Sequence, residues 1–232
     1  MCAILGFTSP SLKKEQVLPY FEKTKSRGPD DTRLEPAGSG MLGFHRLAIM
    51  GLHPEGMQPF HRGGDMAVCN GELYGFRPVK KALEAKGYVF ASDSDCEIIL
   101  SLWQEYGTEM FAGLDAEFAM IIYDSASDSL VAARDPIGIR PLFYGYLADG
   151  SIIFASEAKN LVGLCTHVFP FPPGHYYKDG KFVRYTDLTT VTRYSSDDLD
   201  TVTKKIREKL ISAVEKRLDA DAPLGFLLSG GL

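Results

Sequence analysis

The residue with the clearest potential for chemistry is Cys2, which directly follows the initiator methionine. If Met1 is removed, a thiol and a free α-amine belong to the same residue. An α-amine titrates near roughly pKa 7.7–8.0 and a free thiol near about 8.5, so the amine can accept the thiol proton at neutral pH. The alternative is a small buried side chain at the start of a strand, which is a common role of free cysteine.

Three further positions carry polar groups that could bind a small charged molecule. Arg46 lies in the apolar stretch 41–49, and a buried guanidinium needs either an internal acid or a ligand carboxylate. The step Asn70-Gly71 usually marks a turn, but an Asn amide beside an accessible glycine N–H could also stabilise an oxyanion. Asp95 stands in the first turn of an expected helix, where the helix dipole favours an acid.

The elements that must position these residues are mostly short strands. Apolar patterns predict strands over residues 3–7, 41–49, 65–70, 118–123, 130–134, 141–146 and 152–155, and a hairpin of 175–178 with 181–185. The four strands between 118 and 155 predict an antiparallel meander. Strands interspersed with few helices favour the α+β class over βαβ winding.

Helix signals are fewer. Helices are expected to begin near Pro19, to cover 78–86, to cover 95–106 behind a Ser94–Glu97 capping box, and to cover 157–162 with Ser156 as the cap.

The chain changes character after residue 186. Residues 187–196 are rich in Thr and Ser and predict a linker, whereas 197–218 carry apolar residues three or four apart, which predicts an amphipathic helix. A buried strand is expected over 223–228, followed by Ser229-Gly230-Gly231. A strand that runs into such a loop commonly starts a phosphate-binding site.

Composition excludes several classes of protein. The 232 residues carry a formal net charge of −5, so no broad basic surface for nucleic acid is expected. No apolar run approaches the roughly 20 residues of a membrane span, and residues 3–7 are too short for a signal peptide. The four cysteines lack CxxC spacing and the five histidines lack metal-ligand spacing. We therefore expect a cytoplasmic protein with reduced thiols and no metal, in which Cys69 and Cys96 are structural.

The motifs together resemble the glutamine-dependent asparagine synthetases, which are class II glutamine amidotransferases of the N-terminal-nucleophile type. The resemblance rests on MC-x-I-x-G-F at 1–7, RGPD at 27–30, RLAI at 46–49, MQP at 57–59, NGELY at 70–74, SDCE at 94–97, RDPIGIRPLFYG at 134–145, ASEAKNL at 155–161, FPPG at 171–174 and LLSGGL at 227–232. One departure is Gly75, where the family usually has Asn.

The resemblance implies a four-layer αββα sandwich of antiparallel sheets. It also implies a glutaminase domain over 1–186, a linker over 187–196 and the start of an ATP-pyrophosphatase-type synthetase domain over 197–232, with Ser229, Gly230 and Gly231 in an incomplete nucleotide loop.

Roles for single residues follow from the same resemblance. Cys2 would be the nucleophile and its α-amine the base, while the Asn70 amide and the Gly71 N–H would form the oxyanion hole. The remaining predicted residues bind the substrate L-glutamine. They are Arg46 at the α-carboxylate, Asp95 and Glu72 at the α-ammonium, and Leu47 and Ile49 beside them.

Cofactors and partners are implied only for a longer protein. The glutaminase step needs no cofactor, whereas a full-length synthetase would use ATP, Mg and aspartate, and a homodimer is possible. Two alternatives stay open: an amidotransferase of the same class with another acceptor, and a module without enzymatic activity. A chain that keeps Met1 has no free α-amine on Cys2 and is expected to be inactive.

Overall fold

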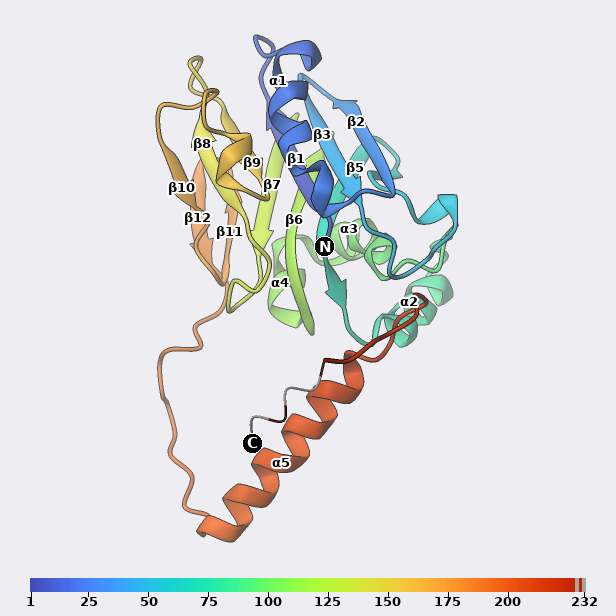
Figure 1. Ribbon diagram of the computed structural model, residues 1–232, viewed down its shortest axis with the longest axis vertical. Coiled ribbons are helices and arrows are strands. Elements are labelled where there is room, and N and C mark those ends of the chain that lie inside the picture. Colours follow the sequence, from blue (N-terminus) through green and yellow to red (C-terminus); the bar gives the residue numbers. More distant parts are fainter. Residues whose placement is uncertain (228–229, 231–232) are drawn as a thin grey trace.

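Two antiparallel six-stranded sheets pack face to face in the computed structural model, and helices cover both outer faces (Figure 1). The structure describes residues 1–227 and Gly230. One sheet has the strand order β10-β8-β9-β1-β3-β2 and the other β12-β11-β7-β6-β5-β4. This arrangement confirms the expected α+β class and the αββα layers.

The first sheet consists of β1 (Ala3–Thr8), β2 (Asp31–Ala37), β3 (Gly40–Arg46), β8 (Phe143–Tyr146), β9 (Ile152–Ala155) and β10 (Val168–Pro170). The second consists of β4 (Phe60–Arg62), β5 (Asp65–Leu73), β6 (Ala116–Asp124), β7 (Ser129–Arg134), β11 (His175–Lys178) and β12 (Lys181–Arg184). The helices are α1 (Lys14–Phe21), α2 (Phe76–Ala85), α3 (Ile99–Tyr106), α4 (Met110–Gly113) and α5 (Leu199–Lys216). Short 3-10 turns are η1 (Glu22–Arg27), η2 (Pro54–Gly56), η3 (Asp95–Ile98), η4 (Gly107–Glu109) and η5 (Ala158–Asn160).

The core follows from the alternation of side chains along each strand. In β1, Ile4 points between the sheets, whereas Leu5 and Phe7 pack under α1. The second sheet repeats the pattern, because Val68 of β5 faces the other sheet and Cys69 faces the helices. Each large side chain buried in this way stabilises the fold by about 1.5–3 kcal/mol.

The predicted meander is wrong, although its four strands exist. Strands β6 and β7 belong to one sheet, and β8 and β9 to the other. Strands β6, β7 and β9 are buried on both faces, so their apolar pattern does not reveal which sheet each strand joins. The connection between the sheets is organised by Asp135, whose carboxylate accepts the N–H groups of residues 137–140 at 2.7–3.1 Å.

Several boundaries also differ from expectation. Helix α1 begins at Lys14 and contains Pro19, since a proline at this position removes one hydrogen bond without ending so short a helix. Strand β2 was not predicted, and β3 ends at Arg46, so residues 47–49 lie beyond the strand.

The predicted caps are wrong as well. The Ser94 side chain caps no helix, because Glu97 instead accepts the N–H groups of Ala91 and Ser92. Ser156 accepts the Ile4 N–H at 2.9 Å and so joins η5 to β1, and the short helix covers only Ala158–Asn160.

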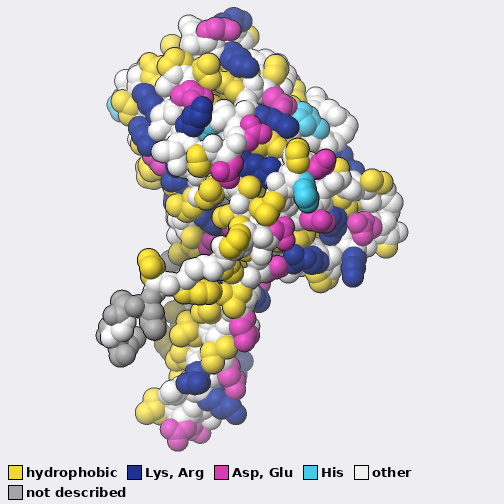
Figure 2. All heavy atoms as spheres, turned by 45° about the vertical axis from the view of Figure 1, so that its right-hand side comes forward, with side chains coloured by type: hydrophobic (Ala, Val, Ile, Leu, Met, Phe, Trp, Pro, Cys, Tyr) yellow, Lys and Arg dark blue, Asp and Glu magenta, His cyan; other side chains and the backbone are white. Residues whose placement is uncertain are grey.

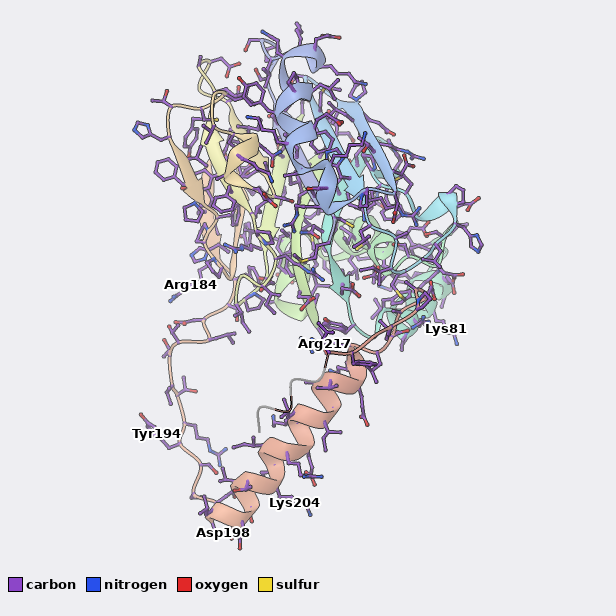
Figure 3. The ribbon with its side chains drawn as sticks, viewed as in Figure 1. Lys81, Arg184, Tyr194, Asp198, Lys204 and Arg217 are labelled. Carbon is purple, nitrogen blue, oxygen red and sulfur yellow. The ribbon has the colours of Figure 1, made fainter. Side chains whose placement is uncertain are left out.

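The part of the chain after the sandwich is extended and then helical. Figure 3 labels Arg184 at the end of the sandwich, Tyr194 in the exposed connection, Asp198 at the start of α5 and Arg217 where the helix returns to the sandwich. Asp198 caps α5 by accepting the Thr201 N–H at 2.8 Å, which agrees with the predicted amphipathic helix.

The strand expected over 223–228 is absent from its described part. Residues 223–227 form no strand, and Phe226 is 74% exposed, because no strand among the described residues lies beside them to pair with. Leu228, Ser229 and Gly231 lie outside the described residues, and Gly230 alone forms no phosphate loop. Among the described helices, none combines the length and apolarity that crossing a bilayer requires.

Candidate active site

A narrow cavity of about 40 Å³ opens where the ends of β1, β3 and β5 meet η3. All eight residues predicted for glutamine chemistry line it, and they come from segments up to about ninety positions apart. They are Cys2, Arg46, Leu47, Ile49, Asn70, Gly71, Glu72 and Asp95. The cavity therefore brings together a thiol, a cation, an amide and two carboxyl groups.

The thiol of Cys2 lies against the backbone of Leu47. Its sulfur is 3.4 Å from the Leu47 nitrogen, which donates to it, and 3.5 Å from the Leu47 oxygen. Burial raises the pKa of the Cys2 thiol, and the Leu47 N–H opposes this by stabilising a thiolate. The Cys2 carbonyl accepts the Arg27 Nε–H at 3.1 Å, which fixes the residue just before β1 begins.

The chain terminus lies in the same cavity. Met1 lines it, and burial lowers the pKa of its α-ammonium group. A lowered pKa leaves a larger fraction of the amine unprotonated near neutral pH, and only that form can accept a proton. Loss of Met1 would transfer the terminal amine to Cys2, next to the thiol.

Asn70 and Gly71 continue strand β5 and form no turn. Asn70 is 1% exposed, and its Nδ2 group has no hydrogen-bond partner in the described part of the chain. A buried donor without a partner costs about 1–3 kcal/mol, so this amide is a candidate for binding an acceptor from outside the protein.

The N–H of Gly71 is aimed by the geometry of the strand. N–H groups alternate in direction along a strand, so Gly71 shares its side with Cys69 and Leu73, away from β6. The Cys69 N–H donates to Gln58 at 2.6 Å, and the Leu73 N–H donates to Asp95 at 2.7 Å. The N–H groups on either side of Gly71 along this edge of the strand therefore both have acceptors. A Cβ at Gly71 would approach the Glu117 oxygen to 2.6 Å, which excludes a side chain.

Arg46 is buried without an acid. It is 7% exposed, and its guanidinium donates to the carbonyl of His53 at 3.1 Å and to that of Gly51. In residues 1–227 no carboxylate lies within ion-pair distance of it, so the internal salt bridge considered from the sequence is not found. The positive charge is thus available to an anionic ligand.

The two acids of the cavity sit in an unfavourable environment for charge. Burial raises the pKa of Asp95, whose carboxylate accepts the Leu73 N–H. Burial and the nearby Asp95 raise the pKa of Glu72 to about 7, although Arg140 opposes this shift. A cation bound beside these carboxyl groups would lower both pKa values and would itself be stabilised.

Arg140 and Gln58 are cavity residues that the sequence analysis did not single out. Arg140 lies 2.7 Å from Glu117 and 3.8 Å from Glu72, and its buried Nε has no partner among the described groups. Gln58 pairs with both backbone groups of Cys69, at 2.6 and 3.1 Å, and so replaces a neighbouring strand. Both residues belong to the motifs MQP and RDPIGIRPLFYG, but spacing along the chain does not reveal their contacts with β5.

The chain matches two known families. Residues 1–176 match the glutamine amidotransferase domain family, and residues 205–232 match the asparagine synthase family. The chain is 36% identical to a probable glutamine-hydrolyzing asparagine synthetase of Dictyostelium discoideum and 38% identical to one of Sandersonia aurantiaca. These alignments cover 100% and 99% of this chain and 44% of each relative.

A solved structure described as the allosteric regulatory enzyme of purine biosynthesis shares the fold. It has a TM-score of 0.64 and 21% identity, and the match covers 83% of this chain and 50% of that one. The family matches lie in the same order as the sandwich and α5 along the chain. The chain therefore belongs to the glutamine amidotransferases, in the branch whose amidotransferase domain is followed by an asparagine synthase segment.

Proposed function

We propose that this chain, once Met1 is removed, hydrolyses free L-glutamine to glutamate and ammonia at Cys2. The observation that carries the proposal is the set of unsatisfied groups around one cavity. Among the described residues, the Asn70 amide nitrogen has no acceptor and Arg46 has no acid, and both side chains line the same cavity as the Cys2 thiol.

The chemistry would proceed through a thioester. The α-amine of Cys2 takes the thiol proton, and the sulfur forms a bond to the side-chain amide carbon of glutamine. The negative oxygen that develops would accept hydrogen bonds from Asn70 Nδ2 and the Gly71 N–H. The C–N bond then breaks, ammonia leaves with the proton from the α-ammonium, and water hydrolyses the thioester to glutamate. The raised pKa of the thiol fits a nucleophile that needs a base.

The charges of the cavity match a free amino acid. Arg46 would bind the α-carboxylate, and Asp95 and Glu72 the α-ammonium, with the backbone at Leu47 and Ile49 alongside. Peptide-bound glutamine lacks both charges and would leave the buried groups unpaired, so the site should reject it. Free glutamine is therefore the proposed substrate.

The use of the ammonia belongs to a longer protein. The curated relatives are named glutamine-hydrolyzing asparagine synthetases, and this chain spans 44% of their length. These names support asparagine synthesis as the use of the ammonia in the full-length protein. Aspartate as the acceptor, with ATP and Mg, belongs to the same proposal. The match of residues 205–232 to the asparagine synthase family favours that acceptor over another.

The test is a glutaminase assay on a chain whose intact mass shows loss of Met1. Ammonia and glutamate should appear in equal amounts, and Cys2→Ala should lower kcat by at least about 10³-fold. A chain with one extra residue before Cys2 should be similarly inactive. Cys165→Ala is the matched control, since Cys165 does not line the cavity. Ammonia release by Cys2→Ala at the parent rate would refute the proposal.

A further inference from the structure

The segment after α5 returns to the sandwich, and two of its contacts are made by aspartates. Figure 1 shows this segment passing beside α2, and there Asp219 forms an ion pair with Arg77. Two residues later the chain reaches the loop that follows β3. The segment lies within the region that matches the asparagine synthase family.

The second contact is a set of three hydrogen bonds. The N–H groups of Asp221 and Ala222 donate to the Ile49 carbonyl at 3.0 and 3.1 Å, and the Asp221 carboxylate accepts the Gly51 N–H at 2.8 Å. Ile49 also lines the cavity. The synthase-like segment therefore holds a loop of the candidate active site through one backbone carbonyl, that of Ile49, and one backbone N–H, that of Gly51.

Gly51 connects this contact to Arg46. Its N–H is bound by Asp221, and its carbonyl accepts from the Arg46 guanidinium. The φ of Gly51 is +56°, and a Cβ there would lie 2.7 Å from the Ser94 nitrogen, so the turn is closely confined. A shift of the Gly51 N–H would consequently shift the carbonyl that aims Arg46.

We propose that Asp221 is a positioning residue, which sets the glutamine affinity of the amidotransferase site by fixing the loop that orients Arg46. The inference rests on the proposed function, because it assigns the aim of Arg46 to the substrate carboxylate. It makes the beginning of the synthase-like region a structural part of the glutaminase site.

The test compares three variants of the 232-residue chain without Met1. Asp221→Ala should raise KM for L-glutamine by about fivefold, within the range of couplings from residues that do not touch a ligand, and should leave kcat within about twofold. Asp221→Asn keeps an acceptor oxygen and should restore most of the affinity. Lys216→Ala is the control at the end of α5, since it removes another contact with the sandwich and its partner Asp115 does not line the cavity.

A second substrate separates positioning from general loosening. The α-amide of L-glutamine has no carboxylate for Arg46, so its KM should be high in the parent chain and nearly unchanged in Asp221→Ala. An unchanged KM for glutamine in Asp221→Ala, an equal rise for both substrates, or an equal effect of Lys216→Ala would each overturn the proposal.

A binding measurement keeps the inference distinct from the proposed function. In a Cys2→Ala background, calorimetry should give a Kd for L-glutamine that Asp221→Ala weakens by the same factor. Binding with this pattern and no turnover by the parent chain would refute the hydrolysis and support the positioning. Turnover by the parent chain with no effect of Asp221→Ala would refute the positioning alone.

Discussion

Helices α3 and α5 carry the same spacing of apolar residues but meet opposite environments. In α3, Ile99, Leu102 and Trp103 are 1%, 7% and 9% exposed, because they pack on the second sheet. In α5, Ile206, Leu210 and Val214 are 61%, 64% and 51% exposed. Figure 2 shows hydrophobic side chains gathered along the projecting part of the molecule that α5 forms. The spacing thus predicts a helix with a binding face, but it does not predict what binds that face.

The difference also separates chemistry from assembly. The sandwich holds every predicted glutaminase residue, whereas α5 joins it mainly through its last turn, where Lys216 pairs with Asp115 and Arg217 lies 4.8 Å from the Tyr74 ring centre. Substitutions in the sandwich site should change activity without changing association. Substitutions on the exposed face of α5 should do the reverse.

The largest expected effect concerns Asn70. Asn70→Ala removes one proposed oxyanion donor and should lower kcat by roughly 10²–10³-fold, with little change in KM. The buried Nδ2 group of Asn70 has no partner in the described part of the chain, so its loss should leave Tm nearly unchanged or slightly higher. Steady-state kinetics and calorimetric melting check both statements. A drop of Tm by several degrees together with only a modest loss of kcat would show that Asn70 mainly stabilises the fold, and would contradict this prediction.

An intermediate effect concerns Glu72 and pH. Its pKa of about 7 means that the carboxyl becomes neutral as pH falls, so KM for glutamine should rise by up to about tenfold per pH unit below 7. Arg140, Asp95 and Glu117 surround this group and are included in that shift. Glu72→Gln should raise KM at pH 8 and flatten its pH dependence. A KM profile that is equally steep in Glu72→Gln would assign the titration elsewhere.

The same substitution should affect stability in the opposite direction. The pKa of Glu72 is raised above its ordinary value of 4.5, so ionisation destabilises the folded state as pH rises from 4.5 through about 7. Glu72→Gln should therefore stabilise the protein at pH 8, by up to about 3 kcal/mol at roughly 1.4 kcal/mol per pKa unit. At pH 4 the two forms should have similar Tm values.

The smallest expected effect on activity lies on α5. Leu210→Glu should leave kcat and KM for glutamine unchanged, because Leu210 does not line the cavity and projects into solvent. It should weaken concentration-dependent self-association, which exposed apolar faces promote, as measured by sedimentation velocity. Lys209→Gln changes the charge equally and serves as the control. A change of kcat or KM in Leu210→Glu but not in Lys209→Gln would show that α5 and the glutaminase site are not independent.

The sequence predicts most elements and, from its motifs, eight of the residues that line the cavity. Local rules alone would have assigned two of these positions a different structure. Asn70-Gly71 has the composition of a turn, yet β6 pairs with both residues and keeps them in a strand. Arg46 has the pattern of a buried salt bridge, yet carbonyl groups surround it. These are positions where tertiary contacts override local preference, which is common at functional sites.

Other features could not be read from the chain because they depend on long-range contacts. The sheet that β8 and β9 join is decided by pairing with β1, about 150 residues away. Gln58 and Arg140 act on β5 through side chains whose types alone do not indicate a partner. The missing strand at 223–227 shows the same dependence, since an apolar run becomes a strand only beside another one.

The fixed position of Cys2 has a practical consequence for anyone who produces this protein. Arg27 holds the Cys2 carbonyl and β1 starts at Ala3, so once Met1 is removed Cys2 alone precedes the sheet. An affinity tag or fusion partner at that end would leave Cys2 without a free α-amine, so the protein should fold but be inactive. Expression should therefore leave this end to a methionine aminopeptidase or to a protease that cuts directly before Cys2, and the fraction processed should equal the fraction active.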